Sequence, residues 1–173
     1  MTTPELTPET IVPFLADLFE RCGADEYAGE QVTISEHMLQ GADLAAKAGV
    51  DETIVAAALL HDVGHFTSEF GMYMPSDTTD KHHDEAGAAL LESFFPPVVT
   101  ECVRLNVAAK RYLCATAPGY FGKLSPASVH TLELQGGPMN EEEVAEFEKN
   151  PWDEEGKVPG KAVPDFRHYA PML

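Results

Sequence analysis

A vicinal His-Asp pair closes the most apolar segment of the chain, residues 57–66, which read AALLHDVGHF. His61 and Asp62 follow directly after Leu60, and His65 comes one helical turn after His61, on the same helix face. Imidazole and carboxylate groups without thiolate suit iron and manganese as well as zinc. The segment therefore predicts a metal centre at the end of a buried helix.

Two further histidines extend this pattern, because His37 precedes the pair and His83 follows it. Three consecutive predicted helices would then each supply ligands to one centre. Each histidine also has an ordinary explanation. His37 could be a polar surface residue, His82 and His83 a solvated helix start, and His61 a partner of the helix dipole. The order His, HDxxH, His favours the metal centre.

A lysine is a candidate for binding an anionic group beside this centre. Lys110 follows Asn106 by four residues, which places both on one helix face. In a protein of net charge −18, an inward lysine is a means of holding an anion. The alternative is a solvated lysine beside Arg111. The free N–H groups of a helix that begins at Ser125 are a second candidate for a phosphate-like group.

Helices are predicted along most of the chain, and no segment shows the alternation of a strand. The starts are indicated by caps at Thr7, Asp51, Ser125 and Asn140, and Asn140 forms a capping box with Glu143. The predicted helices cover about residues 8–22, 31–48, 52–65, 83–95, 98–114 and 126–135, with a seventh from 140. The fold class is therefore all-α, with one domain over 1–173 and a loop-rich tail from about 151.

The composition restricts the classes of partner. Apolar residues make up 44% and charged residues 23%, as in an ordinary globular domain. The net charge of −18 argues against nucleic acid and anionic membranes. The three cysteines form no CxxC pair, the first residues show no signal peptide, and no apolar run is long enough to span a membrane. A cytoplasmic location is the expectation.

The pattern of His37, His61-Asp62 and His83 resembles the HD-domain superfamily. That superfamily includes metal-dependent phosphohydrolases and mixed-valent diiron oxygenases. Several stretches look like the oxygenases that cleave carbon–phosphorus bonds: YAGE at 27–30, VAAKRYL at 107–113, LSPASVHTLELQGGPM at 124–139 and WDEEGK at 152–157. The similarity covers nearly the whole chain, and it implies a single HD-domain helical bundle with the metal site between consecutive helices.

The resemblance also implies a set of site residues around two iron ions, a mixed-valent Fe(II)/Fe(III) pair bridged by Asp62. The metal ligands would be His37, His61, Asp62 and Asp153 for one iron, and Asp62, His83 and residue 106 for the other. The substrate-binding set would be Tyr27, Glu30, His65, Lys110, Ser128, Thr131 and Gln135, of which the first two match residues that close the vacant iron position before substrate arrives. Asp62, His65 and Lys110 would be the catalytic residues.

The chain departs from the family pattern at two positions. The family motif H-V-x-A-K reads NVAAK here, so Asn106 stands where an iron ligand is expected. The segment between Asn150 and Trp152 is also shorter than in the family, which bears on whether Asp153 or, as a fallback, Asp165 reaches the metal. Because an amide oxygen is a weaker donor than imidazole, we expect the second iron to bind weakly and activity to be reduced.

The reaction that the resemblance implies is the oxygen-dependent cleavage of the C–P bond of (R)-1-hydroxy-2-(trimethylammonio)ethylphosphonate to glycine betaine and phosphate. The same reaction on 2-amino-1-hydroxyethylphosphonate, giving glycine, is an alternative. A metal-dependent phosphohydrolase and an impaired variant are others. The expected partners are a small phosphonate and dioxygen. The negative protein suits a quaternary ammonium group, for which Tyr73, Tyr120, Phe121 or Tyr169 could supply an aromatic face.

Overall fold

The computed structural model describes residues 6–22, 32–67 and 76–149 of the 173-residue chain. Within these ranges the regular structure is helical, which confirms the all-α prediction. The helices are α1 (Ile11–Cys22), α2 (Ile34–Lys47), α3 (Glu52–Leu60), α4 (Gly64–Thr67), α5 (His83–Leu91), α6 (Pro97–Arg104), α7 (Asn106–Thr116), the 3-10 helix η1 (Phe121–Lys123), α8 (Pro126–Leu134) and α9 (Glu141–Phe147).

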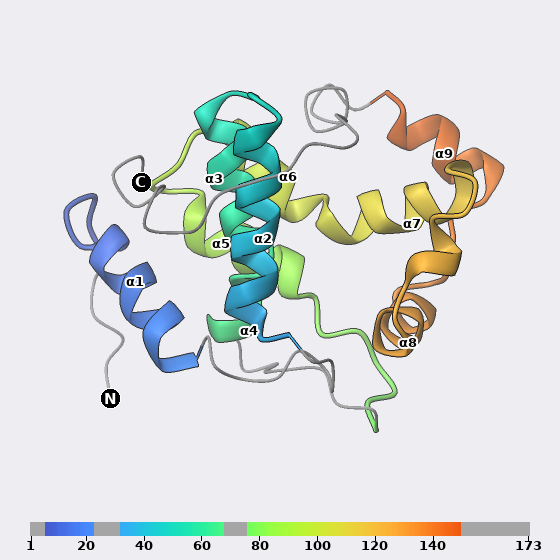
Figure 1. The fold of residues 1–173 in the computed structure, drawn as a ribbon, viewed down its shortest axis with the longest axis horizontal. Helices are drawn as coiled ribbons and strands as arrows, with labels where there is room; N and C mark the ends of the chain where they lie inside the picture. Colours follow the sequence, from blue (N-terminus) through green and yellow to red (C-terminus); the bar gives the residue numbers. More distant parts are fainter. Residues whose placement is uncertain (1–5, 23–31, 68–75, 150–173) are drawn as a thin grey trace.

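A central bundle positions the candidate ligands. In it α3 packs on α2 and α6, and α5 packs on α4 and α6 (Figure 1). Helix α7 leads away from this bundle and packs against α8 and α9, which form the other side of the molecule. The core of the bundle holds side chains such as Met38, Leu59, Val63 and Leu91, each fully buried. None of the helices in the described ranges has the length and apolar character needed to cross a membrane.

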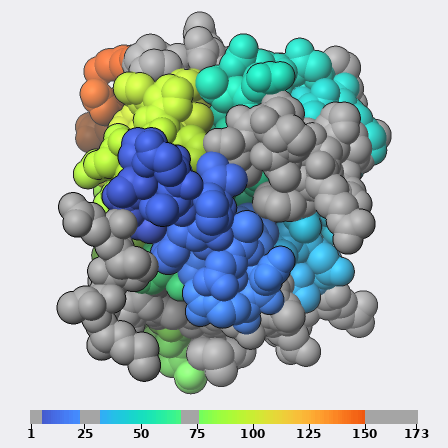
Figure 2. All heavy atoms as spheres, turned by 90° about the vertical axis from the view of Figure 1, so that its left-hand side faces the viewer, coloured from blue at the N-terminus to red at the C-terminus, as the bar shows by residue number. Residues whose placement is uncertain are grey.

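Helix α1 covers one face of the bundle and is seen in blue at the centre of Figure 2. It buries Ile11, Leu15 and Leu18, which recur at helical spacing and form its inner face. The predicted start at Thr7 is wrong, because residues 8–10 form a turn and the helix begins at Ile11; the N–H groups of Thr10 and Ile11 donate to the Thr7 carbonyl oxygen. Pro13 explains the shift: it has no N–H to donate and is tolerated only in the first helical turn.

The caps named from the sequence are confirmed elsewhere. Asp51 accepts a hydrogen bond from the Thr53 N–H at 2.9 Å, and Ser125 accepts one from the Ser128 N–H at 3.0 Å. Asn140 and Glu143 form the reciprocal capping box. A second capping box opens α2, between Thr33 and Glu36, and it places the start of that helix three residues later than predicted.

Two of the predicted long helices are broken, and each break lies at a candidate ligand. The predicted helix over 52–65 ends at Leu60, a turn follows over 61–63, and α4 begins at Gly64. The predicted helix over 98–114 is interrupted at Leu105, with φ −88° and ψ 1°, so that Asn106 is the first residue of α7. Neither break carries proline or a left-handed glycine, so tertiary packing rather than a local signal ends these helices.

A close backbone approach fixes the position of α4. A Cβ built on Gly64 would lie 1.8 Å from the His83 carbonyl oxygen and 2.7 Å from the Gly87 nitrogen. Only glycine allows α4 and the start of α5 to come this near to each other. The contact brings the turn that carries Asp62 and His65 against His83.

We expect Gly64→Ala to destabilise the protein by about 1–3 kcal/mol or more, because the atoms that the new methyl group meets are backbone and cannot rotate away. The free energy of unfolding from chemical denaturation measures this. Gly122→Ala is the control, since its Cβ would have no heavy atom within 4 Å. Equal losses in the two variants would contradict the close-approach explanation.

Candidate metal centre

Three consecutive elements of the bundle bring the predicted ligands together. His37 comes from α2, His61 and Asp62 from the end of α3, and His83 is the first residue of α5. Asp62 and His83 are buried, while the His37 side chain is 43% exposed. The fold therefore brings these residues together around the carboxylate of Asp62, as the sequence predicted.

The first group of ligand atoms consists of His37, His61 and Asp62. The two Nε2 atoms lie 3.1 Å apart, and Asp62 Oδ2 lies 3.4 Å from His61 Nε2 and 3.6 Å from His37 Nε2. Bonds of about 2.1 Å to one ion put neighbouring ligand atoms about 3.0–3.4 Å apart, from octahedral to tetrahedral geometry. The three distances therefore match one metal ion almost without rearrangement.

The hydrogen bond on the far side of the His61 ring prepares this group for a metal. His61 Nδ1 lies 2.7 Å from the Ala58 carbonyl oxygen, which can only accept, so the ring proton is on Nδ1. The lone pair of Nε2 then points toward His37 and Asp62. Histidines that bind a metal usually donate their other ring N–H to a carbonyl or carboxylate oxygen in this way.

Asp62 presents its two oxygens to two different groups. Oδ2 faces His37 and His61, whereas Oδ1 lies 3.3 Å from His83 Nε2 and accepts a hydrogen bond from Asn106 Nδ2 at 3.0 Å. Asn106 Nδ2 is also 3.5 Å from His83 Nε2. This arrangement offers one metal position on each side of the carboxylate.

The carboxyl group of Asp62 stays ionised although the side chain is only 1% exposed. Burial acts to raise the pKa of Asp62, but His61 and His83 outweigh it and hold that pKa well below its ordinary value. Burial likewise acts to lower the pKa of His61, and Asp62 reverses this shift. Oδ2 is fully buried and has no hydrogen-bond partner among the described residues. A buried anionic oxygen in this state fits a bound cation.

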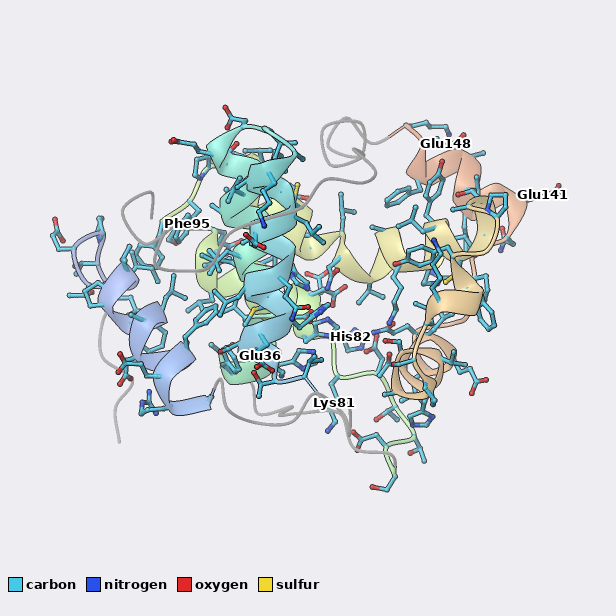
Figure 3. All side chains as sticks on the ribbon, viewed as in Figure 1. Glu36, Lys81, His82, Phe95, Glu141 and Glu148 are labelled. Atoms are coloured by element: carbon cyan, nitrogen blue, oxygen red, sulfur yellow. The ribbon has the colours of Figure 1, made fainter. Side chains whose placement is uncertain are left out.

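His65 lies beside the second group and is 5% exposed. Its ring stacks on that of His83, with the ring centroids 4.1 Å apart and an angle of 12° between the ring planes. One nitrogen of each ring and one Asp62 oxygen lie within 4.8 Å of one another. His82, which is labelled in Figure 3, is different: its side chain is 66% exposed, so the alternative of a solvated helix start applies to His82 and not to the buried His83.

A cavity of about 330 Å³ opens from these ligands toward α7 and α8. Lys110, Ser128, Thr131 and Gln135 line it together with His65, so the structure brings the described part of the predicted substrate-binding set into one space. Lys110 is the only lysine or arginine among the described residues of its lining. The chain therefore places one cation opposite the Asp62 centre.

Lys110 is partly buried and not a solvated lysine. Its Nζ donates to Thr131 Oγ1 at 3.1 Å, and Thr131 Oγ1 donates in turn to the Ser128 carbonyl oxygen at 3.1 Å. Burial lowers the pKa of Lys110, against the opposing charge of Asp62. Arg111 points elsewhere, because it donates to the Gly137 carbonyl oxygen at 2.8 Å and pairs with Glu143 at 2.7 Å.

The side-chain amide of Gln135 has no hydrogen-bond partner among the residues that the structure describes. Its side chain is 9% exposed, and both Oε1 and Nε2 are buried without a hydrogen bond to any described residue. A buried amide that lacks its hydrogen bonds costs free energy. The amide lines the cavity, so a polar ligand there would supply the missing partners.

The far wall of the cavity is apolar and aromatic. Leu113, Tyr120 and Leu124 form it, and burial raises the pKa of Tyr120. Sequence reasoning missed the two leucines. Leu113 follows Lys110 by three residues, a spacing that puts both on one face of α7 and would have indicated it. Of the aromatic candidates, Phe121 is 47% exposed and is not part of this lining.

Several predicted site residues lie outside the described ranges. These are Tyr27 and Glu30, the last ligand Asp153 with its fallback Asp165, and the aromatic candidates Tyr73 and Tyr169.

Within the described ranges, the residues present fit a metal ion. They combine two imidazole nitrogens at the separation expected of ligands to one ion, a buried carboxylate oxygen without a hydrogen bond from any described residue, and a fixed histidine tautomer.

Comparisons with known proteins agree with this site. The HD domain model matches residues 34–111, which span the sequence from before His37 to just after Lys110. The chain is 56% identical to the [1-hydroxy-2-(trimethylamino)ethyl]phosphonate dioxygenase (glycine-betaine-forming) of Leisingera caerulea, over 98% of this chain and 91% of the relative. It is 42% identical to the hydroxymethylphosphonate dioxygenase of Gimesia maris, over 94% of this chain and 86% of the relative.

A viral relative extends the similarity. The chain is 32% identical to an uncharacterized protein of Acanthamoeba polyphaga mimivirus, over 92% of this chain and 78% of the relative. The HD ligand pattern, the helical bundle around Asp62 and the two dioxygenase relatives, each matched along most of its length, point in one direction. The chain belongs to the HD-domain family, among its phosphonate dioxygenases.

Proposed function

We propose that the chain cleaves the C–P bond of (R)-1-hydroxy-2-(trimethylammonio)ethylphosphonate with dioxygen, producing glycine betaine and phosphate. The observation that carries this proposal is the 56% identity over 98% of the chain to a glycine-betaine-forming phosphonate dioxygenase. The overall reaction balances with one dioxygen per substrate: carbon is oxidised to the carboxylate, phosphorus leaves as phosphate, and one proton is released. The cavity beside Asp62 is the proposed place of reaction.

The proposed cofactor is a pair of iron ions that shares Asp62. His37, His61 and Asp62 would hold one ion, with Asp153 as a further proposed ligand. Asp62, His83 and Asn106 would face the other, more weakly bound ion. When bound, such a mixed-valent pair supplies a Lewis acid for the hydroxyphosphonate and an electron for dioxygen. Imidazole and carboxylate ligands with no thiolate support iron in this place.

The phosphonate end of the substrate is assigned to Lys110 and its neighbours. The ammonium group of Lys110 is the cation in the described lining of the cavity, and Ser128, Thr131 and Gln135 lie around the same space. Burial lowers the pKa of Lys110, and a phosphonate dianion there would oppose this shift by favouring the charged ammonium form. It would also accept from the Gln135 amide, whose hydrogen-bonding groups lack protein partners among the described residues.

The trimethylammonium end is assigned to the wall formed by Leu113, Tyr120 and Leu124. A quaternary ammonium group has no N–H donor and is bound well by apolar and aromatic faces. Asp62 is the only carboxylate among the described residues that line the cavity. A primary ammonium group would have three N–H donors to satisfy there. The described wall therefore favours the methylated substrate over 2-amino-1-hydroxyethylphosphonate.

The test is a product assay with and without oxygen. We expect phosphate and glycine betaine in equal amounts from the trimethylated substrate, with one dioxygen consumed per turnover, when the iron-loaded protein is supplied with air. Phosphate should be absent under strict anaerobiosis. The 2-amino compound serves as the comparison substrate and should react much more slowly.

The alternatives differ from this result in their dependence on oxygen or in their substrate. A metal-dependent phosphohydrolase would release phosphate from phosphate esters at an unchanged rate without oxygen. An equally fast reaction of the 2-amino compound, with glycine as the product, would contradict the assignment of the apolar wall. Neither outcome is compatible with the function proposed above.

A further inference from the structure

The two sides of Asp62 differ in the ligands that they offer. On the side of Oδ2, two imidazole nitrogens lie 3.4 Å and 3.6 Å away. On the side of Oδ1, one imidazole nitrogen, that of His83, lies 3.3 Å away and the other near group is the amide of Asn106. An amide nitrogen does not bind metal ions. If Asn106 turns its amide, it offers a carbonyl oxygen, which is a weaker donor to a transition metal than imidazole.

A second imidazole is nevertheless close to this side of the carboxylate. His65 extends from α4 and is 5% exposed, and its nearest ring nitrogen lies within 4.8 Å of both a His83 nitrogen and an Asp62 oxygen. All three side chains are buried, so an ion among them would be removed from water. The group consists of two neutral ligands and one carboxylate, which is a donor set suited to iron or manganese.

The backbone holds His65 in this place. Gly64 brings α4 against the carbonyl of His83, and the His65 ring stacks on the His83 ring at 4.1 Å between centroids. His83 Nε2 and Asp62 Oδ1 already lie 3.3 Å apart, within the about 3.0–3.4 Å expected between ligands of one ion, and the His65 nitrogen lies within 4.8 Å of both residues. Two parallel stacked rings cannot both direct a nitrogen lone pair at one ion, so binding requires the His65 side chain to rotate out of its stack on His83.

We propose that His65 completes the second metal position of this chain, together with Asp62 and His83. This inference rests on the proposed iron cofactor and deepens it. It assigns His65 to the metal and not to the phosphonate, which is left to Lys110, Ser128, Thr131 and Gln135. Asn106 then acts beside the ion, as a hydrogen-bond partner of Asp62 or as a weak additional ligand.

The test is an anaerobic titration of the metal-free full chain with ferrous iron, followed by equilibrium dialysis. The native chain should bind one iron tightly and a second more weakly. In His65→Gln, the dissociation constant of the second iron should rise at least about 10-fold, since even residues that only orient a ligand change metal affinity by about 10–100-fold. The tight iron should be unchanged, which also shows that the variant is folded.

Two variants separate the alternatives for the second position. His65→Phe keeps an aromatic ring against His83 but removes the nitrogen, so it should lose the second iron as His65→Gln does. His82→Gln is the matched control, because it removes the exposed neighbour of His83 and should leave both irons in place. Loss of the second iron in His82→Gln, with no change in the His65 variants, would overturn the proposal.

Asn106→His provides the complementary measurement. An imidazole at this position should tighten the second iron, and in that background His65→Gln should have a smaller effect than in the native chain. If His65→Gln leaves the iron titration of the native chain unchanged and only weakens phosphonate binding, His65 is a substrate contact and the proposal is wrong. Iron binding is measured without substrate or oxygen, so a failed product assay would overturn the proposed function and leave this result standing.

Discussion

Asp62→Asn is expected to remove both metal positions at once. Each Asp62 oxygen faces a separate group, Oδ2 toward His37 and His61 and Oδ1 toward His83. The amide keeps the size of the side chain but removes its negative charge, which the surrounding histidines stabilise. Since even residues that only orient a ligand change metal affinity or activity by about 10–100-fold, a shared ligand should cost more than about 100-fold in both.

Metal content after anaerobic reconstitution with ferrous iron is the first measurement, and phosphate release is the second. Asp84→Asn is the control, because Asp84 is also buried and follows a candidate ligand but does not line the cavity. Burial raises the pKa of Asp84, so this variant tests the loss of a buried carboxyl without loss of a ligand. Retention of both irons in Asp62→Asn would show that the carboxylate is not the shared ligand.

Lys110→Met should weaken phosphonate binding by about 10- to 150-fold, the equivalent of about 1.5–3 kcal/mol for a lost charge-assisted pair. Methionine retains most of the apolar stem, so the packing of α7 should persist. The iron content should not change, because Lys110 is not a candidate ligand and its Nζ donates to Thr131 Oγ1. Binding of the substrate under anaerobic conditions measures the effect without turnover.

The pH dependence gives an independent signature of the same residue. Because burial lowers the pKa of Lys110, its ammonium group loses its proton at a lower pH than an exposed lysine does. Phosphonate binding should therefore weaken as the pH rises through that pKa, and Lys110→Met should lack this alkaline decline. Lys123→Met, which removes an exposed lysine of η1, controls for the change in net charge. Equal affinities of Lys110→Met and the native chain would show that Lys110 does not bind the phosphonate.

Local signals explain how much of the fold could be predicted. Asp51, Ser125 and Asn140 cap helices because their side chains reach N–H groups two or three residues away, and such contacts need nothing beyond the neighbouring sequence. Pro13 and the Thr33–Glu36 capping box are signals of the same kind, and they were present in the sequence although the predicted starts overlooked them.

The helix breaks could not be predicted in this way. The turn over residues 61–63 and the interruption at Leu105 lie within apolar or helix-favouring stretches that lack proline and left-handed glycine. They occur because α4 packs on the backbone of α5, and because α7 continues toward α8 and α9. Contacts between distant segments decide such breaks, and no local propensity records them.

By itself, the sequence determined the helical class and the ligand types: imidazoles and one carboxylate delivered by an apolar helix, with a lysine on a later helix. Residue chemistry and short-range spacing carry that information. The tertiary structure alone decided that Asp62 turns its two oxygens to different groups, that Lys110 rather than Arg111 faces the cavity, and that His65 stacks on His83. These relations depend on where α4, α5 and α7 meet, and atoms that are far apart in the chain acquire their distances only through packing.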